Sequence, residues 1–127
     1  MGTSRLSIVF AAMVVVGCGE PQFNGDFRII GPADPSYNCI AHVLGRHEWV
    51  QPSGESYDAF FVRQGYTRCA ADEADMVFYS GGHVSLRRGK VWTSKLGKNV
   101  LIEHDSVDDL TGHSYGRVES YWRRTRG

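Results

Sequence analysis

The chain has 127 residues, and its 14 lysines and arginines balance 14 aspartates and glutamates, so the formal net charge at pH 7 is zero. This balance argues against nucleic acid as a partner, because binding to a polyanion needs a concentrated basic surface. The length suits one small domain with one modest core. The basic cluster near the C-terminus is expected to be a solvated tail (Arg117, Arg123, Arg124 and Arg126).

Residues 1–17 have the pattern of a signal peptide. Arg5 precedes an apolar stretch, residues 6–16, that is too short to span a bilayer as a helix. Residues 15–18 (Val-Val-Gly-Cys) resemble the lipobox of bacterial lipoproteins, which implies cleavage before Cys18 and acylation of that cysteine. We therefore expect a bacterial envelope protein held to a membrane through lipidated Cys18, with its domain outside the cytoplasm. An ordinary secretory signal that contains a cysteine by chance is the alternative.

After cleavage, a tether is expected over residues 18–35, where three of the four prolines lie, with a short edge strand at residues 27–30. A single domain is expected over residues 36–127. Its first helix should cover Cys39–Leu44, capped by Ser36 or Asn38 and stopped by Gly45.

A second helix is expected at residues 57–64, and the pattern changes to strands after Gly65. Strands are predicted at residues 75–80, 83–87, 90–95, 100–102 and 117–122, with a short helix at 107–110. Helices followed by an antiparallel meander predict an α+β domain, with the N-terminal helices packed on the sheet.

Cys39 and His83 are the residues that suggest chemistry. A cysteine at a helix N-terminus is placed for thiolate formation, because the unpaired N–H groups and the helix dipole favour negative charge there. His83 follows Gly81-Gly82 and begins a predicted strand, so it could serve as the base of a thiol nucleophile.

A third polar residue would have to orient the imidazole. The neighbouring strand offers Ser94 and Thr93 for this role. The backbone N–H of Cys39, with Asn38 or Tyr37 beside it, would form an oxyanion site. Lys95 could bind an anionic group of a substrate, although a solvated strand end is the simpler interpretation.

This order of residues resembles the papain-like cysteine hydrolases, and in size and layout the cell-wall peptidases and amidases of the NlpC/P60 and CHAP kinds. The resemblance implies a small papain-like fold and a peptide or amide substrate in the envelope. Serine or threonine in third place departs from these enzymes, which use His, Asn, Asp or Gln there. The chain also resembles a family of uncharacterised bacterial domains without an established activity, through several short motifs (Asn38–Ala41, Gly65-Tyr66 with Cys69, His83-Val84, Trp92–Gly97, Ile102–His104 and Tyr115-Gly116).

Simpler interpretations stay open for each of these residues. Cys39 could be a core residue or form a disulfide with Cys69, and His83 could be structural. His42, three residues after Cys39, could contact it on the same helix face. No cofactor is expected and no metal, because His104 and His113 lack a ligand spacing. The two functions that follow are a tethered cysteine hydrolase and a non-catalytic envelope lipoprotein that binds or scaffolds.

Overall fold

The computed structural model describes residues 23–125. The expected signal peptide, Cys18 and Arg126 therefore lie outside the described residues. In the described part of the chain, no helix is both long enough and apolar enough to cross a membrane.

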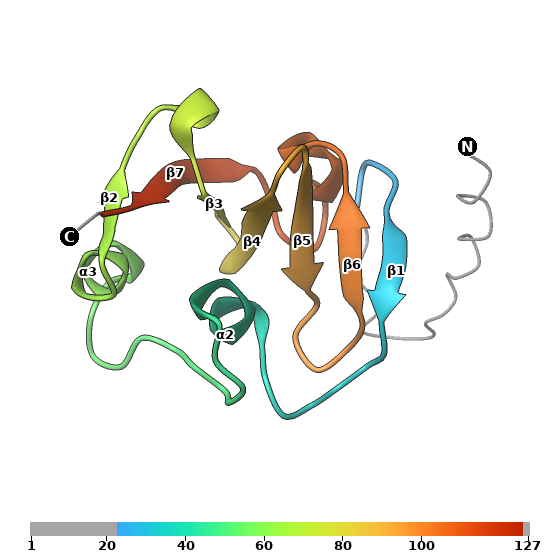
Figure 1. The fold of residues 1–127 in the computed structure, drawn as a ribbon, viewed down its shortest axis with the longest axis horizontal. Helices are drawn as coiled ribbons and strands as arrows, with labels where there is room; N and C mark the ends of the chain where they lie inside the picture. Colours follow the sequence, from blue (N-terminus) through green and yellow to red (C-terminus); the bar gives the residue numbers. More distant parts are fainter. Residues whose placement is uncertain (1–22, 126–127) are drawn as a thin grey trace.

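A seven-stranded antiparallel sheet dominates the domain (Figure 1). Strands β3 to β6 follow one another as a meander, β1 is added at the β6 edge, and β7 lies between β3 and β2. The spatial order is β1 (Arg28–Gly31), β6 (Leu101–His104), β5 (Val91–Lys95), β4 (His83–Arg88), β3 (Met76–Tyr79), β7 (Val118–Arg124) and β2 (Tyr66–Arg68).

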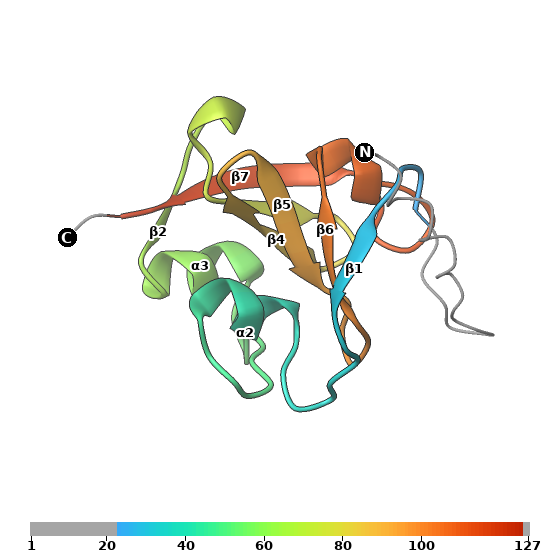
Figure 2. The same ribbon diagram turned by 45° about the vertical axis from the view of Figure 1, so that its right-hand side comes forward.

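Two short α-helices, α2 (Cys39–Leu44) and α3 (Tyr57–Arg63), lie on one side of this sheet, which we call the helix face (Figure 2). The opposite face carries the short 3₁₀ helix η3 (Val107–Leu110), and a second one, η2 (Ala71–Glu73), precedes β3. The bounds of α2 follow from its caps: Asn38 accepts a hydrogen bond from the Ala41 N–H, and Gly45 ends the helix at φ 72°.

Each face of the sheet has its own apolar cluster, because successive side chains of a strand point to opposite sides. On the helix face, strand residues pack beneath α2 and α3 (Met76, Phe78, Val84 and Trp122 against Ile40, Ala41, Phe60 and Phe61). On the opposite face, a second cluster gathers below η3 and the N-terminal segment (Val77, Tyr79, Ile102 and Leu110 with Phe23, Phe27 and Tyr115). The two clusters place neighbouring residues of one strand in separate environments.

The predicted papain-like α+β fold is wrong. The helices are confirmed at their expected positions, but α2 has six residues and α3 has seven, too few for the helical half of such a fold. The sheet is instead larger than expected, because β2 was missed and β7 inserts beside β3. The protein is a small β-rich domain in which two helices of fewer than two turns each cover part of one face of the sheet.

Two further boundaries differ from the sequence-based expectation. Strand β1 pairs with β6, so the folded region begins before residue 36 and includes part of the expected tether. Arg123 and Arg124 pair with Thr67 and Tyr66 as part of the sheet, so they do not belong to a solvated tail.

Candidate functional site

The side-chain amide of Asn38 has a structural role. Its Oδ1 accepts from the Ala41 N–H at 3.2 Å and from the Val50 N–H at 3.1 Å, and its Nδ2 donates to the Val50 carbonyl at 2.8 Å. Asn38 is buried, so these bonds cap α2 and fasten the following loop to it. One of the two N–H donors of this amide is used by the Val50 carbonyl, and both acceptor bonds of its oxygen go to backbone groups.

Cys39 is the first residue of α2, as expected, but its thiol is buried among apolar side chains. Burial raises the pKa of the Cys39 thiol, and this effect outweighs the backbone hydrogen bonds, that of Val84 foremost, which lower it. The thiol is therefore neutral at pH 7. Cys39 and Cys69 are both free, so the disulfide alternative is wrong.

His83 opens β4 as expected, and it points to the face opposite Cys39. Val84, the next residue, packs in the helix-face cluster with Cys39, whereas the His83 ring stacks on Tyr115 with centroids 4.0 Å apart and planes 2° apart. Burial lowers the pKa of His83 well below its usual value. Among residues 23–125, His83 Nε2 has no hydrogen-bond partner, and the hydrogen bonds that lower the pKa of the Cys39 thiol come from backbone groups. The structure does not bring the expected nucleophile and base together.

Thr93 lies on the helix face, where it pairs with His42. The Thr93 hydroxyl donates to the Leu86 carbonyl at 3.4 Å and lies 2.8 Å from His42 Nε2. Burial lowers the pKa of His42 to about 4, so the ring is neutral at pH 7. Thr93 therefore orients His42, a residue of α2, rather than His83.

Ser94 points to the opposite face and joins a buried polar network that crosses three strands. Its Oγ lies 2.5 Å from Ser85 Oγ and 3.1 Å from His104 Nε2, while His104 Nδ1 lies 3.0 Å from the Ser106 carbonyl. Since a carbonyl only accepts, His104 carries its proton on Nδ1 and accepts from Ser94 at Nε2. A serine hydroxyl next to an oriented imidazole is the geometry of a nucleophile. However, Ser85, Ser94 and His104 are completely buried, so no substrate reaches them.

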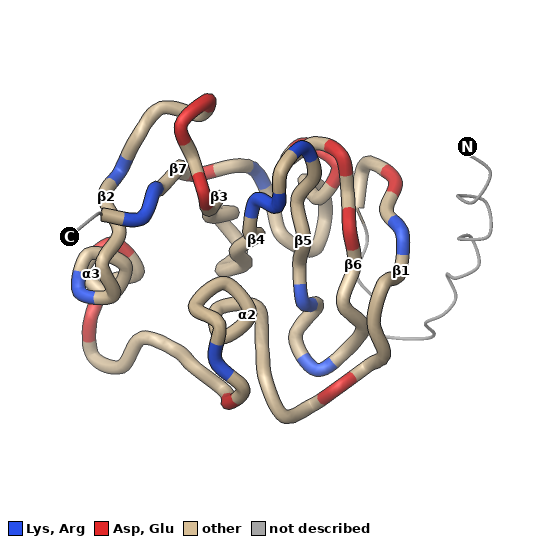
Figure 3. Tube along the Cα trace, in the orientation of Figure 1, with Lys and Arg blue, Asp and Glu red and all other residues tan. Residues whose placement is uncertain are grey.

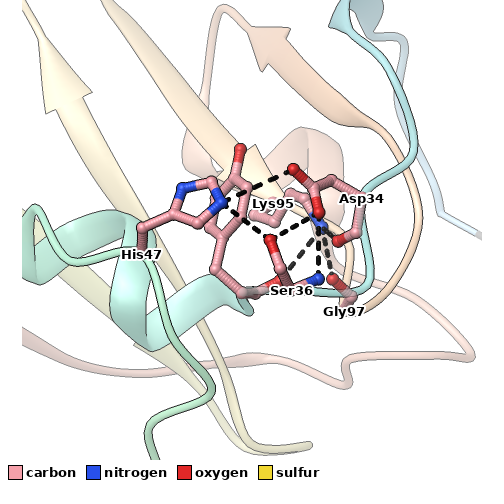
Figure 4. Close-up of polar contacts among 6 residues, drawn as sticks. Asp34, Ser36, His47, Lys95 and Gly97 are labelled. Atoms are coloured by element: carbon pink, nitrogen blue, oxygen red, sulfur yellow. Dashed lines mark hydrogen bonds and ion pairs between the residues drawn. The ribbon is translucent and has the colours of Figure 1, made fainter.

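The ammonium group of Lys95 is held by three backbone carbonyls, those of Asp34 at 2.5 Å, Gly97 at 2.7 Å and Tyr37 at 3.1 Å (Figure 4). It also lies 4.5 Å from the centre of the Tyr37 ring. An ammonium group has three N–H donors, and all three are used here. Lys95 therefore ties together the segment before α2 and the β5–β6 turn, and it has no donor for a substrate anion.

A more exposed polar cluster lies beside Lys95 (Figure 4). The Ser36 hydroxyl donates to Asp34 Oδ1 at 2.6 Å and lies 2.7 Å from His47 Nε2. Hydrogen bonds from the Ser36 side chain and backbone lower the pKa of Asp34. Because the Ser36 proton goes to Asp34, His47 must donate to Ser36 and cannot act as its base. This cluster is a turn-stabilising network.

The partners of the expected residues were not predicted from the sequence: these are His42 for Thr93, and Ser85 with His104 for Ser94. Strand alternation did place Ser85 on one face with His83. The missing information was the register of β6, which sets His104 opposite Trp92 and so places it beside Ser94. In residues 23–125, no group of three or more His, Cys, Asp or Glu side chains is placed to hold a metal ion.

The fold and these contacts define a small β-rich domain whose polar residues near the sheet centre are structural. The chain belongs to the family described as Domain of unknown function (DUF7689), which it matches over residues 28–123. The match begins at β1, in agreement with the place where the sheet begins. No curated protein and no solved structure matches the chain. Nothing in these comparisons links it to the NlpC/P60 or CHAP hydrolases.

Proposed function

We propose that this protein is a lipid-anchored, non-catalytic lipoprotein of the bacterial envelope, whose small β-rich domain serves as a binding or scaffolding module. The anchor is Cys18, which follows the lipobox-like residues 15–17. The domain would lie outside the cytoplasm, at the surface of the membrane that holds the acyl chains.

The observation that supports a non-catalytic role is that Cys39 and His83 lie on opposite faces of the sheet. A thiol nucleophile needs a base within hydrogen-bond reach, or another cause that lowers its pKa. Cys39 has no such base, and burial outweighs the backbone hydrogen bonds that lower its pKa. The residues expected to complete a hydrolase site are bound elsewhere (Asn38 to Val50, Thr93 to His42, Ser94 to His104 and Lys95 to three carbonyls).

Thiol labelling tests this proposal against the hydrolase. A variant with Cys18→Ser and Cys69→Ser leaves Cys39 as the one thiol, and iodoacetamide is added to the folded and to the urea-unfolded chain at pH 7.5. We expect labelling in the folded state to be slower by at least about tenfold, because the buried thiol is neutral. Fast labelling of folded Cys39 that disappears in His83→Ala would instead establish a catalytic pair and overturn the proposal.

The anchor is tested separately in cells. The full chain, expressed in a bacterium fed an alkyne analogue of palmitate, should take up the label, and Cys18→Ser should abolish it. Cys69→Ser is the matched control, since it removes a cysteine of the folded domain and should leave labelling unchanged. An unlabelled wild-type chain, recovered as a soluble protein, would exclude the lipid anchor.

A further inference from the structure

The N-terminal part of the described chain is fixed to the domain from Phe23 onward. The Phe23 ring packs against Phe27 and Tyr115, with centroids 5.8 Å and 5.2 Å away. The backbone N–H of Asn24 donates to Thr111 and that of Gly25 to Asp109, at 2.7 Å and 2.9 Å. This segment therefore moves with the domain and cannot serve as a flexible linker.

A lipid anchor at Cys18 would leave a very short connection to this fixed segment. Four residues lie between Cys18 and Phe23, and the five Cα–Cα steps that join them span at most about 18 Å when fully extended. A domain of about 100 residues has a radius of gyration of about 13 Å, so its diameter exceeds this reach. The side of the domain that carries Phe23 must then stay close to the bilayer surface.

Strand β1 follows Phe27 directly and forms one edge of the sheet, on the side away from β2 and the C-terminus (Figure 1). It exposes two adjacent aliphatic side chains, Ile29 at 43% and Ile30 at 49%. Exposed apolar residues on an edge strand favour aggregation unless something covers them. An anchor at Cys18 would place the bilayer surface within reach of these two side chains.

The charges beside β1 give this edge no basic attraction for an anionic partner. Arg28 pairs with Glu103 at 2.9 Å and with Asp105 at 3.0 Å, so the three groups together carry a formal charge of minus one (Figure 3). Aliphatic side chains enter the boundary between lipid headgroups and acyl chains without a charge attraction. A zwitterionic lipid surface is thus sufficient to bind the β1 edge.

We infer that the β1 edge, centred on Ile29 and Ile30, is the surface by which the domain rests on the bilayer. The inference builds on the lipid anchor of the proposed function and adds an orientation to it. The isoleucines enter the headgroup region, while α3 and β2, at the other end of the sheet, face away from the membrane.

Quenching of tryptophan fluorescence by brominated lipid tests this orientation. Residues 18–127 with Cys69→Ser are coupled through Cys18 to a maleimide phospholipid in phosphatidylcholine vesicles, with or without brominated acyl chains. Cys39 is buried and does not compete. One variant carries Ile30→Trp, and the control carries Val62→Trp on α3, where the native valine is 62% exposed. The fluorescence of the added tryptophan is obtained by subtracting that of the parent chain.

We expect brominated lipid to reduce the Ile30→Trp signal about twofold or more and to leave the Val62→Trp signal nearly unchanged. Tryptophan itself favours the interface, and both variants share this bias. Equal quenching at both positions would overturn the inference and leave the β1 edge as a surface for a protein strand. The coupling is chemical, so this result does not depend on acylation in the cell. Loss of alkyne-palmitate labelling, by contrast, would overturn the anchor alone.

Discussion

Replacing Lys95 by methionine should destabilise the domain more than any substitution of an exposed residue. Methionine keeps most of the apolar stem but removes the three N–H donors from the carbonyls of Asp34, Tyr37 and Gly97. A hydrogen bond from a charged group contributes about 1.5–3 kcal/mol, and removal of the buried charge returns part of this as relief of desolvation. We expect a net loss of about 3–5 kcal/mol, because three carbonyls each lose a donor at a cost of about 1–3 kcal/mol and the relief of desolvation offsets part of this.

A loss of this size is a large fraction of the stability of a small domain, which is about 5–15 kcal/mol in total. It corresponds to a fall in melting temperature of roughly 15–30 °C for a domain of about 100 residues. Urea unfolding followed by tryptophan fluorescence measures the free energy directly. The control is Lys98→Met in the same turn, where the native lysine is exposed, and it should change stability by no more than about 0.5 kcal/mol.

A chemical test distinguishes the loss of the three hydrogen bonds to carbonyls from a simple loss of packing. In Lys95→Ala the three carbonyls remain, so added methylammonium should raise the melting temperature, whereas sodium chloride at equal ionic strength should not. A destabilisation of less than about 1 kcal/mol in Lys95→Met would refute the reasoning, because it would mean that water replaces the ammonium group at little cost.

The remaining predictions concern acid sensitivity and two buried polar groups. Burial lowers the pKa of three histidines, His42, His83 and His104. Below about pH 6.5 the unfolded chain therefore binds more protons than the folded chain. The free energy of unfolding must then fall as pH falls, by up to about 1.4 kcal/mol per pH unit for each ring. Urea titrations at pH 7 and pH 5 measure this change, and equal stability at both would contradict neutral burial of the rings. Asn38→Ala removes a helix cap and leaves the N–H and carbonyl of Val50 unpaired, so it should cost about 2–4 kcal/mol, against about 1 kcal/mol for the exposed cap in Ser56→Ala. Ser94→Ala removes the donor to His104 Nε2 and should cost about 1–3 kcal/mol, and a neutral result would show that Ser85 takes over this bond.

Local features of the fold were predicted well because they depend on residues close together in the chain. The helix at Cys39–Leu44 has the expected bounds, since Asn38 caps it and Gly45 adopts the left-handed conformation that ends it. The turn at Gly89 and the strands on either side of it were also expected. The alternation of apolar and polar residues and the turn residues that indicate them lie within a few positions of one another in the sequence. Strand β2 was missed, since its three residues give too short a pattern.

The candidate site was predicted less well, for a reason that Thr93 and Ser94 illustrate. Both were candidates for one role, yet as neighbours in a strand they point to opposite faces, and each has a different histidine as its partner. Which histidine that is depends on the packing of α2 and on the register of β6, and both involve residues far away in the sequence.

The sequence by itself determined the local elements, the residues whose side chains can take part in a reaction, and the lipobox-like pattern at Cys18. Only the tertiary structure decided that Cys39 and His83 lie on opposite faces of the sheet and that the ammonium group of Lys95 is enclosed by carbonyls. The physical reason is that a pleated strand separates neighbouring side chains by the thickness of the sheet. The reactivity of each side chain is then set by the long-range contacts that bury it.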